Sequence, residues 1–442
     1  MPDPEYGLIT DEKIRRLRLR VGADLDPANF APAEISRAAW RPVTNGYNQV
    51  VTPDAVRHFV NGYGDDNPLY CDPAYAEASS WRGLIAPPTF VWTMCDPQTD
   101  QEVVLGGGDE PPRRLTAAGR ELFAGDPLRG TGSVQSRVEY EFYRPLEAGD
   151  RLYGKRTILA VEDRPSRKSG RAVHVTWGLV TWNQDRLPVH LQRGTWVRTE
   201  RRQANGEGVP RKRVQPSAEP YTDEQLAEID AAYAAESRRG SSLLHWDDVQ
   251  VGDRLPVLVK GPLRQTDIIL WHAGWGQGFP TYAFRLAYER RVETPGLYTR
   301  NEYNVPDIVQ RMHWDKDWAQ RVGAAERYDY GALRETWLCQ LLTHWAGDRS
   351  WISSIDVEHR KYNYIGDTTW LKGEVTGKRV TGGQHRVAVK LWCENQRGEV
   401  TSPATAEVVL PGKDAGLGWA PPVPGDPVDL LRAEIARFAG TA

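Results

Sequence analysis

A histidine near two carboxylates, followed by a glycine at the start of an apolar segment, is the pattern in this sequence with the clearest chemical meaning. His313 precedes Asp315 and Asp317, and Tyr330 and Gly331 open the apolar run. An imidazole with an ordinary pKa of about 6.5 transfers protons at neutral pH, and a neighbouring carboxylate can orient it. A backbone amide at a helix N-terminus can stabilise an enolate oxygen. The stretch therefore predicts an acid/base site that faces a polarised carbonyl.

The composition indicates a globular protein whose partner is a small molecule. Of the 442 residues, 40% are hydrophobic and 26% are charged, enough for a sizeable core and two or more domains. A net charge of -3 provides no basic field for nucleic acid or a membrane surface. Four cysteines without a Cys-x-x-Cys pair predict neither a metal site nor a disulfide framework. Because the sequence shows no leader-like start and no membrane-length apolar run, we expect a cytoplasmic protein.

Helices and loops in the first half must position any residues that act there. Helix starts are expected at Thr10 and Thr52, and the second helix runs into a segment rich in turn formers. In that segment Asp65, Asn67 and Tyr70 belong either to a surface turn or to a loop that aims them inward. The segment at 83–92 is expected to form a loop that leads into a buried apolar helix.

An antiparallel sheet is expected after these helices, because apolar and polar residues alternate with a period of two. This pattern predicts four strands, near 134–144, 151–161, 171–183 and 187–198. The segment Glu147–Leu152 before one of them is echoed by Tyr364–Thr369 in the second half. A recurrence at this distance indicates the duplication of one module.

These signals divide the chain into two domains. The N-terminal domain covers residues 1–200, and a basic linker with a junction helix that starts at a capping box covers 201–243. The second domain covers 244–415, and residues 416–442 form a C-terminal tail.

Both halves resemble one known family. Asn67–Pro73 together with Gly83–Phe90 resembles the N-terminal dehydratase domain of MaoC-like proteins. Met312–Ala319, with Tyr330-Gly331 and Leu341–Gly347, resembles the catalytic half of the same double hotdog proteins. The resemblance implies an α+β fold, a tandem hotdog in which each central helix is wrapped by an antiparallel sheet. It also implies a hydro-lyase that performs R-specific hydration or dehydration of a 2-enoyl or 3-hydroxyacyl thioester. No cofactor is implied beyond the coenzyme A of the substrate, and the assembly is expected to be a homodimer or a hetero-oligomer.

The resemblance also suggests which residues act. His313 matches the catalytic histidine, while Gly331, with Tyr330 before it, matches the glycine whose amide binds the thioester oxygen. The family aspartate stands five positions before the histidine, where this sequence has Ile308; the nearest carboxylate is Asp307. We predict His313 and Asp307 as catalytic residues and Gly331 and Tyr330 as substrate-binding residues.

In the first half the order Asp-x-Asn-Pro is intact at Asp65 and Asn67, but Tyr70 replaces the histidine. A phenol with an ordinary pKa of about 10 is a poor base at neutral pH. We therefore assign Asp65, Asn67 and Tyr70 to substrate binding in the acyl pocket.

Three alternatives stay open. The partner group of His313 can lie in the aromatic insertion at 275–308, in the first half or in another chain; the insertion itself is either surface packing or a lid. His272 is a second candidate for the catalytic histidine. The chain as a whole is an enzyme of this kind, a thioester-binding subunit that needs a partner, or a thioesterase on the same fold.

Overall fold

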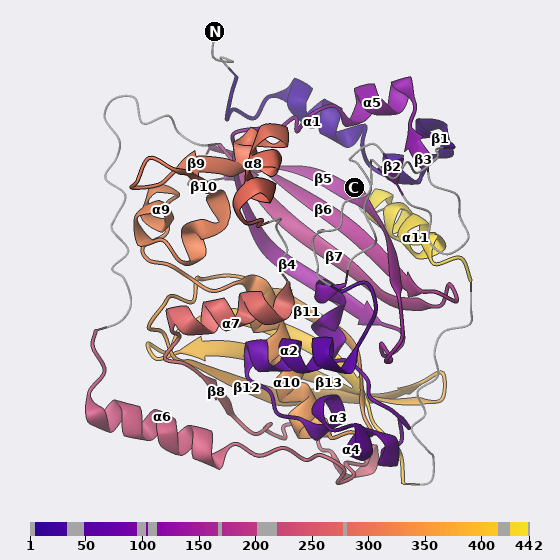
Figure 1. The fold of residues 1–442 in the computed structure, drawn as a ribbon. Coiled ribbons are helices and arrows are strands. Elements are labelled where there is room, and N and C mark those ends of the chain that lie inside the picture. Colours follow the sequence, from indigo (N-terminus) through magenta and orange to yellow (C-terminus); the bar gives the residue numbers. More distant parts are fainter. Residues whose placement is uncertain are drawn as a thin grey trace.

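An antiparallel sheet of nine strands runs through both halves of the chain (Figure 1). The computed structural model describes residues 5–32, 48–94, 103–104, 113–166, 170–200, 219–276, 281–413 and 425–440. Helices cover parts of this sheet, and a long helix of the second half lies close to its centre. The α+β class predicted from the sequence is confirmed.

All four strands expected in the first half are present. Apolar residues at every second position of the first strand, Val138, Tyr140 and Phe142, are buried, whereas the glutamates between them are partly exposed. A period of two places one strand face against the core. The strands are β4 (Gly132–Phe142), β5 (Leu152–Ser166), β6 (Gly170–Asn183) and β7 (Pro188–Thr199).

The second half repeats this sheet and continues it. Its strands are β8 (Leu258–Lys260), β11 (Trp351–Glu358), β12 (Thr369–Thr381), β13 (Gln384–Asn395) and β14 (Val400–Val409). The order across the sheet is β5-β6-β7-β4-β11-β14-β13-β12-β8. Strands β4 and β11 pair at the seam between the halves, where Arg137 lies 2.5 Å from Asp356 on the neighbouring strand. The two sheets are therefore one hydrogen-bonded unit.

The central helix of the second half is α10 (Gly331–Ala346), which begins at the glycine marked by the sequence. It contacts β11, β12, β13 and β14 and also helices of the first half, so that it is buried along nearly all of its length. Several of its polar residues are buried as well, among them Arg334, Glu335, Gln340 and His344. Each of these needs a hydrogen-bond partner inside the protein.

The first half has shorter helices: α2 (Pro53–Tyr63), α3 (Pro68–Cys71), α4 (Pro73–Ala78) and the 3-10 helix η4 (Pro88–Thr93). Helix α2 begins after Thr52, as expected, and the Thr52 side chain accepts the Ala55 amide. The segment at 83–92, predicted as a loop, contains most of η4. The apolar helix expected after it falls on residues 95–102, which lie outside the described part.

Helix α2 packs against its counterpart in the second half, α7 (Gln265–Trp275). A Cβ atom on Gly274 would lie only 2.6 Å from the carbonyl oxygen of His58, so glycine is required for this close approach. Helix α7 carries His272 toward the start of α10.

The insertion in the second half forms helix α8 (Phe284–Glu293), η6 (Pro295–Leu297) and a hairpin of β9 (Tyr298–Arg300) and β10 (Pro306–Ile308). Helices η7 (Val309–His313) and α9 (Lys316–Arg321) follow it. Arg311 is buried and donates to the carbonyl oxygens of Thr299, Arg300, Asp307 and Ile308. This guanidinium therefore fastens the hairpin to the segment that carries His313.

The remaining elements cover the outside of the first half or connect the halves. They are α1 (Asp11–Arg18), η1 (Ala23–Leu25), η2 (Pro27–Asn29), β1 (Phe30–Pro32), β2 (Val103–Val104), β3 (Arg113–Leu115), α5 (Ala117–Phe123), α6 (Asp223–Ala235), η5 (Trp246–Asp248) and α11 (Val428–Ala439). Helix α6 starts at the predicted capping box of Thr222, whereas the basic part of the linker, 201–218, lies outside the described residues. None of the described helices is both long and apolar enough to cross a membrane.

Helix α11 lies within the segment interpreted as a C-terminal tail, and it returns to the first half. Leu431 packs with Leu159 and Val180 of the sheet, and Arg193 donates to Glu434 at 2.7 Å. This segment thus completes the core of the first half.

Candidate active site

His313 is the last residue of η7 and lies buried against the start of α10. Its Nδ1 atom is 2.8 Å from the carbonyl oxygen of Tyr328, which only accepts, so that Nδ1 carries the hydrogen. The ring stacks on Tyr330, with 3.7 Å between centroids, and meets Tyr328 edge-on at 4.7 Å. These contacts hold the imidazole in the tautomer whose Nε2 atom carries the free electron pair.

Burial makes His313 a neutral base. Loss of hydration lowers its pKa to about 3, and the nearby His272 acts in the same direction. At neutral pH the imidazole is therefore uncharged, with no proton on Nε2.

The hydroxyl of Tyr330 lies between two nitrogen atoms. Gln310 Nε2 donates to it at 2.9 Å, and Nε2 of His272 lies 2.6 Å from it. Burial raises the pKa of Tyr330 well above its ordinary value and lowers that of His272 to about 4. The two histidines proposed from the sequence as alternatives thus lie on either side of one phenol.

Gly331 begins α10, so that its amide has no earlier carbonyl within the helix to bind. A Cβ atom at this position would lie 2.8 Å from Nε2 of His359, which follows β11. Glycine is needed here because the imidazole of His359 fills the space beside its Cα. The amide is placed as the resemblance predicts, whereas the histidine beside it was not expected.

His359 belongs to a buried polar chain that crosses the seam between the halves. Its Nε2 atom is 3.0 Å from Glu335 Oε1, and the other oxygen of Glu335 accepts the Tyr140 hydroxyl at 2.6 Å. Trp92 in turn donates to Tyr140 at 2.9 Å. Glu335 is fully buried, so its oxygens need these hydrogen bonds. The first turn of α10 is thereby tied to β4 and η4.

A second buried pair supports the same turn. Arg334 lies 3.1 Å from Asp329 and donates to Ser402 at 2.8 Å, and Ser402 lies 3.3 Å from Nδ1 of His359. Burial raises the pKa of Asp329 to about 6, although Arg334 and Asn363 oppose this effect. The residues on both sides of Gly331 are therefore held by charged and hydrogen-bonded partners.

The two carboxylates near His313 in sequence have other contacts. Asp307 lies on β10 and lines an open cavity of about 430 Å³ together with Arg311 and Trp314. Asp315 caps α9 and lies 3.0 Å from Arg311. Among the hydrogen bonds of the described residues, neither carboxylate contacts His313. The structure does not bring the predicted pair of His313 and Asp307 together.

The motif of the first half is buried and meets the second half. Asp65 accepts the Tyr63 hydroxyl at 3.0 Å and the Asn67 amide at 3.0 Å, and it lies 3.2 Å from Nε2 of His344 on α10. Asn67 in turn caps α3. The imidazole beside Asp65 therefore comes from His344, in the other half of the chain.

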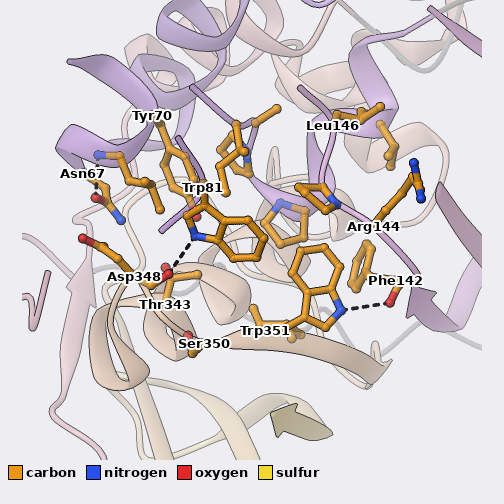
Figure 2. A pocket seen from close by; sticks show the side chains of 18 of the residues that line it. Asn67, Tyr70, Trp81, Phe142, Arg144, Leu146, Thr343, Asp348, Ser350 and Trp351 are labelled. Carbon is orange, nitrogen blue, oxygen red and sulfur yellow. Dashed lines mark hydrogen bonds between the residues drawn. The ribbon is translucent and has the colours of Figure 1, made fainter. Parts of the chain in front are cut away.

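Asn67 and Tyr70 line a small aromatic cavity of about 40 Å³ (Figure 2). Trp81 and Trp351, 6.0 Å apart, form part of its wall, and each indole donates to a backbone carbonyl. Pro88, at the start of η4, also lines it, and a proline has no amide hydrogen with which to bind an oxyanion. Of the three residues predicted to bind substrate in this half, Asp65 does not line the cavity.

Sequence reasoning missed Gln310, His359 and Glu335. Gln310 stands three positions before His313, where the family motif has asparagine. Its position in the motif could therefore have identified it as a site residue. His359 and Glu335 carry no local pattern. In the described residues, no group of three or more His, Cys, Asp or Glu is placed to hold a metal ion.

Comparisons with known proteins agree with this architecture. Residues 41–192 match the family model described as FAS1-like, dehydratase domain region. A UPF0336 protein of Streptomyces avermitilis is 31% identical over 124 residues, which cover 27% of this chain and 67% of that relative. A solved MaoC-like dehydratase has a TM-score of 0.55 at 18% identity, over 89% of this chain and 99% of its own. The chain belongs to the MaoC-like hotdog dehydratase family.

The MaoC-like fold extends over both halves, whereas the matched family model and the Streptomyces relative cover much less of the chain. A probable enoyl-CoA hydratase alpha subunit of Thermomonospora curvata is 27% identical over 173 residues, or 38% of this chain and 48% of that relative. The chain thus spans 48% to 67% of the length of these curated relatives. His313 and Gly331 lie outside the residues that match the family model.

Proposed function

We propose that this MaoC-like protein adds water to, or removes it from, the 2-enoyl and 3-hydroxyacyl forms of an acyl thioester. The observation that carries the proposal is the placement of the neutral, buried imidazole of His313 next to the first turn of α10. A base in contact with the residue that precedes this amide suits chemistry next to a thioester carbonyl.

In the dehydration direction, Nε2 of His313 takes the proton from the carbon next to the carbonyl. The amide of Gly331 binds the oxygen on which negative charge develops, an interaction worth about 3 kcal/mol per donor. The bond to the hydroxyl then breaks, and the hydroxyl leaves as water after it has received a proton from an acid group. Hydration is the reverse of these steps.

The carrier and stereochemistry follow from the family. Coenzyme A is the proposed carrier and part of the substrate, no further cofactor takes part, and the hydroxyl has the R configuration. We propose a homodimer or a hetero-oligomer as the working assembly. The first half contributes the aromatic cavity but no base at Tyr70 and no amide at Pro88, so the chemistry is placed in the second half.

The test is hydration of crotonyl-CoA and decenoyl-CoA by the purified chain, with His313→Asn as the key variant. The asparagine amide can still donate to the Tyr328 carbonyl but cannot act as a base. We expect a loss of turnover of about 100-fold or more, as for removal of a general base. His58→Ala is the matched control, since His58 is exposed on α2. Normal turnover in the asparagine variant would refute the proposal, and chiral analysis of the product tests the R configuration.

A second candidate is a thioester-binding subunit whose second acid/base group comes from another chain. It is favoured by the observation that no described carboxylate contacts His313. In that case the purified chain binds enoyl-CoA without hydrating it. Hydration by the chain alone would rule this candidate out.

A further inference from the structure

The position that holds the catalytic aspartate in the family motif is filled here by a side chain without acid/base chemistry. Ile308 is buried and apolar, and Asp307 lines an open cavity on the hairpin. A reaction that moves two protons still requires a second group close to His313. Two phenols contact the His313 ring: Tyr328 meets it edge-on, and Tyr330 stacks on it with the shorter distance between ring centroids.

Burial raises the pKa of the Tyr330 hydroxyl, and the hydrogen bond from Gln310 opposes that effect. Gln310 donates to the phenol oxygen at 2.9 Å. Nε2 of His272 lies 2.6 Å from the same oxygen, and the tautomer of His272 decides which of the two atoms donates. In the Nε2–H tautomer both neighbours donate to the oxygen, and the hydroxyl hydrogen then points at a third partner. Two hydrogen bonds to the oxygen stabilise it as its proton departs.

The surroundings strengthen these hydrogen bonds. Trp275 meets Tyr330 edge-on at 5.3 Å, and Trp314 meets His272 edge-on at 5.2 Å. Trp314 also lines the open cavity beside the hairpin. Hydrogen bonds are electrostatically stronger in such a low-dielectric environment than in water.

We propose that Tyr330 is the second acid/base group, which gives its proton to the departing hydroxyl while His272 and Gln310 stabilise its oxygen. This inference rests on the proposed hydration and dehydration activity. It assigns to Tyr330 the role that the family motif gives to an aspartate, and it makes Gln310 and His272 positioning residues.

The protons balance over the whole reaction. In dehydration, His313 gains the proton from the carbon next to the carbonyl, the carbon–oxygen bond breaks and the double bond forms. The hydroxyl takes the phenol proton of Tyr330 and leaves as water. The imidazolium of His313 then returns a proton to the phenolate, whose ring it stacks on. Both side chains regain their starting forms, and water is the only species released besides the enoyl thioester.

The experiment separates the two proton transfers. Hydration of crotonyl-CoA requires both groups, whereas deuterium exchange into butyryl-CoA in D2O requires only the base, because butyryl-CoA has no hydroxyl. Tyr330→Phe keeps the ring that stacks on His313 and removes only the hydroxyl. Tyr362→Phe removes a phenol from a neighbouring aromatic cluster and serves as the control. Gln310→Leu is a second variant that removes one donor to the phenol, in case Tyr330→Phe does not fold.

We expect Tyr330→Phe to lower kcat for hydration by about 100-fold or more with little change in KM, and to keep exchange within about threefold of the wild type. Gln310→Leu should give a smaller loss in hydration alone. Hydration near the wild-type rate in Tyr330→Phe overturns the inference while leaving the role of His313 intact. Equal losses of hydration and exchange also overturn it, because they show that Tyr330 only positions His313. A wild-type chain inactive in both assays refutes the proposed function instead.

Discussion

The depressed pKa of His313 predicts how the stability of this protein depends on pH. In the folded state the pKa is about 3, whereas an unfolded histidine has a pKa of about 6.5. The unfolded chain therefore takes up a proton between these values while the folded chain does not. The contribution of His313 to the free energy of unfolding is therefore fully present above about pH 6.5. It is lost as the pH falls from about 6.5 toward 3.

The magnitude follows from the width of the window. From about pH 6.5 to pH 5 there are about 1.5 units at about 1.36 kcal/mol each, so His313 alone should cost about 2 kcal/mol at pH 5. Folded proteins are typically stable by about 5–15 kcal/mol, so this loss is a sizeable part of the total.

The assay is urea unfolding of the wild type and His313→Asn at pH 8 and at pH 5, followed by tryptophan fluorescence. Other titrating groups are common to both chains, so the difference in free energy of unfolding isolates His313. We expect the advantage of the wild type over the variant to shrink by about 2 kcal/mol between pH 8 and pH 5. An unchanged difference would show that the imidazole is not held neutral by burial, and the reasoning would fail.

Three further predictions concern the surroundings of the site. Gly331→Ala should destabilise the protein by about 1–3 kcal/mol and lower hydration, because the new Cβ atom would meet His359 at 2.8 Å; thermal unfolding and kcat measure this. Glu335→Gln should cost about 1.5–3 kcal/mol in unfolding free energy, since it keeps the shape but weakens two hydrogen bonds to a buried carboxylate. Arg311→Met should speed hydrogen exchange in the hairpin at 298–308 while the central sheet stays protected, because the hairpin carbonyls lose their donor.

Each of these predictions has a contrary result. An alanine at 331 with wild-type stability would mean that His359 moves aside freely. A glutamine variant at 335 as stable as the wild type would mean that the two hydrogen bonds of this side chain contribute little to stability. Equal exchange in the hairpin with and without Arg311 would mean that other contacts hold it.

Local patterns in the sequence were sufficient for much of the fold. The alternation at Val138, Tyr140 and Phe142 predicted β4, and the capping box at Thr222 predicted α6, because both depend on residues a few positions apart. The 3-10 helix η4 within the segment predicted as a loop at 83–92 was not foreseen. Nor was the return of Leu431 to the first half, since packing between distant segments has no local signature.

In the candidate site, too, local sequence patterns were readable, whereas contacts between distant segments were not. The register of the motif around His313, Tyr330 and Gly331 was readable, and Gln310 could have been read from it. Asp307 was predicted as the partner of His313 because it is the carboxylate nearest to the position of the family aspartate, yet it lines an open cavity at the hairpin. Distance along the chain does not measure distance in space once a segment turns back on itself.

The sequence by itself determined the type of fold, the candidate base and the glycine that begins the central helix. Only the tertiary structure decided which groups surround them: the phenol of Tyr330 between two histidines, His359 against Gly331, and Asp65 beside His344, 279 positions away. The physical reason is that secondary structure follows from interactions within a few residues, whereas partners of buried polar groups are set by how the helices and the sheet pack together.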